Sequence, residues 1–89
     1  MKIKDGFMLR EVAGAYVVVP VGGRADDFNG MIHLNETGAF FWKLAQKEVN
    51  RQDMIDAGLR EYDAAPERIA KDVDTFINIL KDNSLLQES

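Results

Sequence analysis

The first third of the chain carries apolar residues in short runs separated by turn residues, a pattern typical of β-strands. Two such runs, at 6–12 and 15–20, flank an Ala-Gly pair at 13–14. This pair predicts a two-residue hairpin turn, because glycine accepts a positive φ without steric cost. The three consecutive valines at 17–19 favour a central strand, and Pro20 should end it because proline has no N–H for the hydrogen-bond ladder.

A third strand is predicted from about Asn29 to Leu34. Alternation along this strand places Met31 and His33 on one face and Ile32 and Leu34 on the other. Strands that follow one another closely usually pair in antiparallel order. The three segments therefore predict a three-stranded antiparallel sheet at the N-terminus.

An aromatic helix is predicted directly after the third strand. Asn35 suits the N-cap position because its side-chain oxygen can accept from free N–H groups of the first turn, and Glu36 places a negative charge at the positive end of the helix dipole. The apolar face is too large to remain in water, so we expect a core helix from about Glu36 to Lys47 or Glu48. That face consists of Phe40, Phe41, Trp42, Leu44 and Ala45.

A second helix is predicted after a short break. Asn50, with Asp53 three residues later, is typical of a helix N-terminus in which cap and third residue bond to each other. Gly58 costs up to about 1 kcal/mol relative to alanine inside a helix, which is explained if another backbone packs closely there. The apolar stripe of this helix consists of Ile55, Leu59 and Tyr62.

A third helix begins with Pro66 in its first turn, where the missing N–H costs nothing, and should stop near Asn83. Leu85 and Leu86 are apolar again, so we expect them to fold back onto the core as a short extended segment. The helix carries a clean apolar stripe with helical spacing. Its members are Ile69, Val73, Phe76, Ile77 and Leu80.

Three strands followed by three helices predict a single α+β domain spanning residues 1–89. With 89 residues, 46% of them apolar and 29% charged, the chain has the composition of a soluble domain with one core. A domain of this size buries only about 60–65% of its unfolded surface, so its stability is modest unless a partner or a homodimer adds buried area. The chain has neither an apolar run long enough to span a membrane nor a signal peptide pattern, which predicts a cytoplasmic location.

The charge pattern argues against nucleic-acid binding. The chain has 15 acidic and 11 basic residues, for a net charge of −4, whereas proteins that bind phosphate backbones concentrate positive charge. The third helix has three basic and four acidic side chains, and the second has two basic and three acidic, so each has a net charge of −1. A winged-helix transcriptional regulator is nevertheless the alternative function, because such proteins place a helix in the major groove.

The parts needed for catalysis are missing from the sequence. Cysteine is absent, His33 is the only histidine, and the two serines, Ser84 and Ser89, lie at the C-terminal end, so we expect no nucleophilic enzyme and no cofactor. His33 is interpreted as a surface or groove residue rather than a base or metal ligand. Asp26 and Asp27 are adjacent acids in a polar loop, interpreted as a solvated turn rather than a metal site.

The stretch from Leu34 to Leu44, with its Asn-x-x-Gly cap and aromatic cluster, resembles the signature of the PqqD family. These small domains are best known from the assembly of pyrroloquinoline quinone and act as recognition elements for ribosomally made, later modified peptides. The segments at 6–12, 15–20 and 27–32 are similar to the family's sheet, and the two amphipathic helices ending in Leu85-Leu86 to its C-terminal half. The resemblance covers about residues 5–87 and implies a winged helix-turn-helix-like arrangement.

The resemblance also implies a function. In this family the leader of a precursor peptide lies as an added strand along the third strand, beside the third helix, and a radical-SAM or other peptide-modifying enzyme acts on the peptide. A leader peptide of another modified product is favoured over the quinone precursor. By this resemblance the strand edge supplies main-chain hydrogen bonds and the helix supplies an apolar wall. The implied site residues are Asn29, Met31, Ile32, His33 and Leu34 of the edge, Ile69, Val73 and Phe76 of the wall, and Arg68 and Asp72 at the rim.

A second interpretation of the wall stays open at this point. A stripe with helical spacing is what any packed helix shows, so a simple core role is the more common one for Ile69, Val73 and Phe76. Trp42 and its aromatic neighbours are interpreted as core, and Asn35 as a structural cap.

Overall fold

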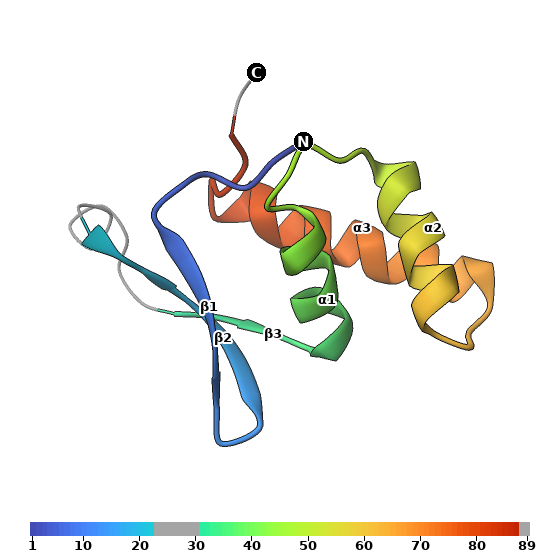
Figure 1. The fold of residues 1–89 in the computed structure, drawn as a ribbon, viewed down its shortest axis with the longest axis horizontal. Coiled ribbons are helices and arrows are strands. Elements are labelled where there is room, and N and C mark those ends of the chain that lie inside the picture. The colour runs from blue at the N-terminus through green and yellow to red at the C-terminus, as the bar shows by residue number, and fades with distance from the viewer. Residues whose placement is uncertain (23–30, 88–89) are drawn as a thin grey trace.

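The computed structural model describes residues 1–22 and 31–87, and it shows an antiparallel sheet followed by helices (Figure 1). The strand order is β1-β2-β3, so β2 lies in the centre. This arrangement confirms the predicted α+β class, with a three-stranded antiparallel sheet preceding three helices. The elements are β1 (Phe7–Val12), β2 (Ala15–Pro20), β3 (Ile32–Leu34), α1 (Glu36–Leu44), α2 (Arg51–Glu61) and α3 (Pro66–Asp82).

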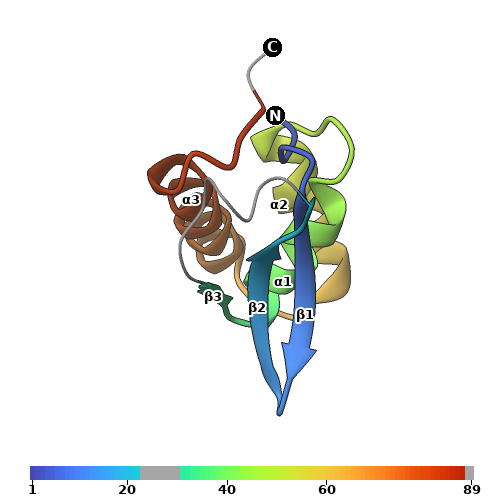
Figure 2. The ribbon, with the colours of Figure 1, turned by 90° about the vertical axis from the view of Figure 1, so that its left-hand side faces the viewer.

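Helix α1 lies between the sheet and α2. Helix α3 extends past the sheet, α1 and α2 (Figures 1 and 2). The core formed between them contains side chains from every helix and from β2 and β3. Trp42 is 3% exposed and Phe41 fully buried, which confirms the core role predicted for this part of α1. No helix among the described residues is both long enough and apolar enough to cross a membrane.

The β1–β2 hairpin forms as the sequence predicts. Val12 pairs with Ala15 across the turn, and both turn residues have positive φ, 52° at Ala13 and 81° at Gly14. Positive φ at both positions is the geometry whose twist matches a two-residue hairpin. β2 ends at Pro20 as expected.

The junction from β3 into α1 depends on a tight cap. The Asn35 side-chain oxygen accepts from the Gly38 N–H at 2.7 Å and from the Thr37 hydroxyl at 3.0 Å, which confirms the predicted N-cap. A Cβ on Gly38 would lie 3.1 Å from that same oxygen and 3.3 Å from Leu34 Cβ. Glycine at position 38 therefore lets the cap and the last residue of β3 approach closely.

The end of α1 was predicted three to four residues too late. The helix stops at Leu44, with Ala45 as its C-cap. The Ala45 carbonyl accepts from the Ile3 N–H at 3.0 Å, so the N-terminal segment occupies an acceptor that a longer helix would use itself.

The start of α2 is confirmed, but its buried face matches the predicted one only in part. Asn50 and Asp53 each bond to the other's backbone N–H, forming the expected capping box. Of the predicted stripe, Ile55 is buried, Tyr62 is half-buried and Leu59 is 38% exposed. The buried residues of α2 are Met54, Ile55, Ala57 and Gly58.

The close neighbour of Gly58 is a side chain and not the backbone we expected. A Cβ at this position would lie 2.8 Å from Cγ2 of Ile69 and 3.5 Å from the Phe41 ring. Contacts below 3.0 Å require something to shift, so glycine at position 58 allows α2 to pack directly against a β-branched residue of α3.

The third helix begins with Pro66 and is capped at Asn83, as predicted. After it, Leu85 is fully buried and Leu86 forms a bridge with Ile3, which confirms that the C-terminal segment folds back in extended form. All five residues of the predicted stripe of α3 are buried.

Candidate functional site

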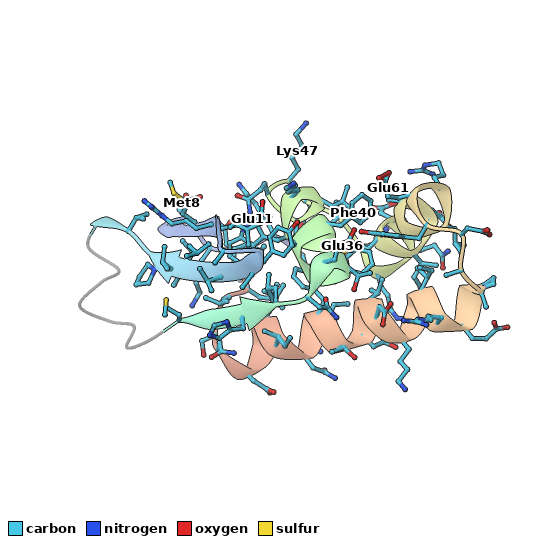
Figure 3. The ribbon with its side chains drawn as sticks, turned by 90° about the horizontal axis from the view of Figure 1, so that it is seen from below. Met8, Glu11, Glu36, Phe40, Lys47 and Glu61 are labelled. Carbon is cyan, nitrogen blue, oxygen red and sulfur yellow. The ribbon has the colours of Figure 1, made fainter. Side chains whose placement is uncertain are left out.

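The candidate site is built on β3, which lies at one edge of the sheet. Its Tyr16–Leu34, Val17–His33 and Val18–Ile32 pairs join it to β2, and no strand is described on its other side. Figure 3 shows α3 running alongside β3 on the side away from β2, and Figure 2 agrees. The open edge of β3 therefore faces α3.

The hydrogen-bond phase of the sheet identifies which main-chain groups of β3 face outward. Val21 N–H donates to the Gly6 carbonyl at 2.9 Å, so the odd-numbered residues of β2 direct their main-chain groups to β1. The even-numbered Tyr16 and Val18 direct theirs to β3, where they meet Leu34 and Ile32. The main-chain N–H and C=O of His33 therefore point to the open edge.

A groove of about 190 Å³ lies between β3 and α3. Its floor and walls are partly apolar: Leu34 and Phe76 are buried at 7% and 1% exposure, and Ile79 is half-buried. Polar groups from both sides complete it. The lining residues are His33, Leu34, Asn35, Gly38, Asp72, Thr75, Phe76 and Ile79.

One charged side chain in the groove has no charged partner among the residues that the structure describes. Asp72 is half-buried, and within the described residues it makes no ion pair and accepts no side-chain hydrogen bond. A ligand that supplies a cation or a hydrogen-bond donor here would give this carboxylate a charge-assisted partner.

The structure brings four of the ten predicted site residues together in this groove: His33, Leu34, Asp72 and Phe76. Ile69 and Val73 are 1% and 0% exposed in the core, so they support the wall from behind rather than forming its surface. The remaining positions divide by burial. Met31 is 59% exposed just before β3, Ile32 is buried, Arg68 is exposed on α3, and Asn29 lies outside the described residues.

Sequence reasoning missed Thr75, Ile79, Asn35 and Gly38 as groove residues. A signal for the first two was present, because residues three and seven positions after Asp72 share its face of a helix. Asn35 and Gly38 were recognised only as parts of the cap. Their place in the groove follows from the fold, which sets the N-terminus of α1 beside α3.

The other hollows and side-chain clusters are weaker candidates for a functional site. Two larger hollows, of about 770 and 530 Å³, lie where the chain ends meet the last turns of α3, and both include Met1, Lys81 and Leu86. Neither touches β3. Among residues 1–22 and 31–87, no group of three or more His, Asp or Glu side chains could hold a metal ion. Asp26 and Asp27 lie outside the described residues.

A family model described as coenzyme PQQ synthesis protein D (PqqD) matches residues 7–86. The chain belongs to the PqqD family. The match includes the sheet, the capped α1, both later helices and the returning C-terminal segment. It therefore contains every residue of the groove between β3 and α3.

The PqqD fold is also found in a solved structure, that of TbiB1 in complex with the TbiA(beta) leader peptide. The two structures superpose with a TM-score of 0.73 over 100% of this chain and 98% of the other, at 20% sequence identity. At this identity the likeness shows a shared fold. No curated protein sequence matches the chain.

Proposed function

We propose that this PqqD-family protein is a non-catalytic recognition domain that binds the leader of a ribosomally made precursor peptide by strand addition along β3. It then presents the peptide to a separate modifying enzyme, a radical-SAM protein by family analogy. The observation that carries the proposal is the open main chain of His33 beside a partly apolar groove. The leader complex of TbiB1, which shares the fold, supports this choice of ligand.

The physics of strand addition matches both halves of the site. An added strand exchanges main-chain hydrogen bonds with the open edge, each worth about 0.5–1.5 kcal/mol net. Its alternate side chains point to the same face as Ile32 and Leu34 and so enter the groove. Main-chain bonds give affinity for any extended peptide, whereas the groove selects among side chains.

The outer edge of β1 is the competing place for an added strand. The same hydrogen-bond phase directs the main chain of Glu11 away from β2, so this edge is also open to pairing. Glu11 lies on the side of the molecule away from α3, however (Figure 3). The groove between β3 and α3 gives β3 a side-chain selector, which favours β3.

The test uses a synthetic leader segment of a candidate precursor peptide, such as one encoded by a short reading frame if one is found beside this gene, titrated into ¹⁵N-labelled protein. We expect the His33 amide and residues of the groove to shift together. His33→Pro removes one outward N–H and should weaken binding roughly three- to tenfold more than His33→Ala does. The matched control is Glu11→Pro, which removes an outward N–H from the other edge and should leave the affinity unchanged.

Two results would contradict the proposal. Peptide shifts at Glu11 with a silent His33 would place the added strand on β1. An equal loss for both proline variants, with circular dichroism showing intact folds, would mean that neither edge is specific.

The presenting role has its own test. Modification of the precursor by its modifying enzyme should need this protein, and His33→Pro should slow it in proportion to the lost peptide affinity. Full modification without the protein would limit its role to peptide binding.

A further inference from the structure

Asp72 is the one acidic group among the described residues that line the groove; it has no ion-pair partner among the described residues, and it lies on α3 one turn before Phe76. The rest of the lining is apolar or uncharged apart from His33. A ligand side chain that brings a cation here would pair with this carboxylate, whereas an acidic one would face like-charge repulsion. The groove is therefore built to distinguish the sign of one ligand side chain.

The chain directions of β3 and α3 fix the order in which a ligand meets the groove residues. β3 leads into α1, and α3 runs alongside it in the opposite direction (Figures 1 and 3). A strand added antiparallel to β3 therefore runs in the same direction as α3. Such a strand passes Asp72 before it passes Phe76 and Ile79.

The spacing of Asp72 and Phe76 along α3 sets the distance between the two ligand side chains that the groove selects. One helical turn from Asp72 to Phe76 covers about 6 Å along α3. Alternate residues of a strand lie about 6.8 Å apart on the same face. The intervening ligand residue lies opposite His33 and points to the same face of the sheet as the His33 side chain, away from the face of Ile32 and Leu34.

We infer that this groove selects a leader segment of the form cation-x-apolar, with Lys or Arg paired to Asp72 and a large aliphatic or aromatic side chain against Phe76 and Ile79. The inference rests on the proposed function and adds the composition and polarity of the ligand. Asp72 acts as a specificity-determining residue, and the unspecified middle residue takes the main-chain bonds of His33.

The experiment is selection from a display library of random 12-residue peptides on the full chain. Wild-type protein should enrich Lys or Arg two residues before a large apolar residue, and Asp72→Lys should enrich Asp or Glu at that first position. Glu67→Lys makes the same charge change on the opposite face of α3 and should keep the wild-type preference. In fluorescence polarisation, a Lys-to-Glu exchange in an enriched peptide should weaken binding about tenfold to wild type and strengthen it to Asp72→Lys.

The outcomes separate this inference from the proposed function. Selected peptides that shift the His33 amide but show no charge preference, or show the reversed order apolar-x-cation, would overturn the inference and leave strand addition standing. Selected peptides that leave His33 silent would overturn both. Thermal denaturation of each variant confirms that the comparison is made between folded proteins.

Discussion

Two stripes of side chains lie next to each other on α3 and meet different surroundings. The inner stripe, which the sequence shows clearly, is buried against α1, α2 and the sheet. The neighbouring stripe of Asp72, Thr75 and Ile79 lines the groove instead, and Phe76 belongs to both. A rotation of less than one-third of a turn around the helix thus separates residues that hold the fold from residues that can meet a ligand. An apolar stripe identifies the core side of a helix, and residues that can bind a ligand are to be sought along the border of that stripe.

The largest expected effect tests the core that the inner stripe packs into. Trp42→Ala should lower the free energy of unfolding by about 3–5 kcal/mol, because it empties a large volume in a core where this ring is 3% exposed. Small domains have about 5–15 kcal/mol in total, so part of the protein will be unfolded at 37 °C. Urea denaturation measures the loss. A thermal midpoint within one degree of wild type would mean that Trp42 is outside the core.

Neighbouring residues of α3 give the sharpest form of the comparison. Leu80 is fully buried and Ile79 half-buried. Leu80→Ala should cost about 2–5 kcal/mol, whereas Ile79→Ala should cost about 1 kcal/mol because much of its surface is already in water. Peptide affinity should show the reverse order once the variants are compared as folded proteins by titration. Equal stability losses would mean that the groove wall is part of the core.

Gly58 tests how tightly the inner stripe is packed from the side of α2. Gly58→Ala should destabilise by about 1–3 kcal/mol, although alanine is the better helix former, since its Cβ would lie 2.8 Å from Ile69 Cγ2. In an Ile69→Ala background the clash is gone, so the same change should be neutral or stabilising. A double-mutant cycle in urea measures this coupling. Equal effects in both backgrounds would place the strain elsewhere.

The smallest effect concerns the outward side of α3, opposite the groove. Asp74 accepts two hydrogen bonds from Arg51, at 2.7 and 3.1 Å, and this pairing holds the pKa of Asp74 below its ordinary value. A lowered folded-state pKa gives stability that is present above the unfolded-state pKa and is lost as pH falls through the folded-state one. Wild type should therefore be slightly more stable than Asp74→Asn near neutral pH, and the difference should vanish once the pH has fallen below the lowered folded-state pKa of Asp74. Because the pair is half exposed, the gain is small. Peptide affinity should not change.

Local chemistry was enough to predict much of the fold. The caps at Asn35 and Asn50, the hairpin turn and the two ends of α3 each depend on residues close in sequence, so the pattern alone identifies them. The end of α1 could not be predicted in this way, because the Ala45 carbonyl is bonded by Ile3, more than forty positions earlier.

The candidate site was predictable in part for the same reason. Period-two alternation placed Ile32 and Leu34 on one face, which the structure buries, and the resemblance to PqqD directed attention to this strand and α3. Which flank of α3 faces the strand depends on how α3 is rotated in the assembled core. The sequence pattern carries no information on that rotation, so Ile69 and Val73 were assigned to the wall, while Thr75 and Ile79 were overlooked.

The meeting of the two chain ends bears on how such a domain can be joined to others. The Gln87 N–H donates to the Lys2 carbonyl at 2.7 Å, and the Lys4 N–H donates to the Leu85 carbonyl. These hydrogen bonds hold the N-terminal and C-terminal segments side by side. They lie at the end of the molecule away from β3 (Figures 1 and 2). A domain whose two ends lie close together can be inserted into a loop of a larger enzyme without disrupting the fold of either protein. Fusion at this point would leave the groove free, so one architecture suits both a separate carrier and a built-in module.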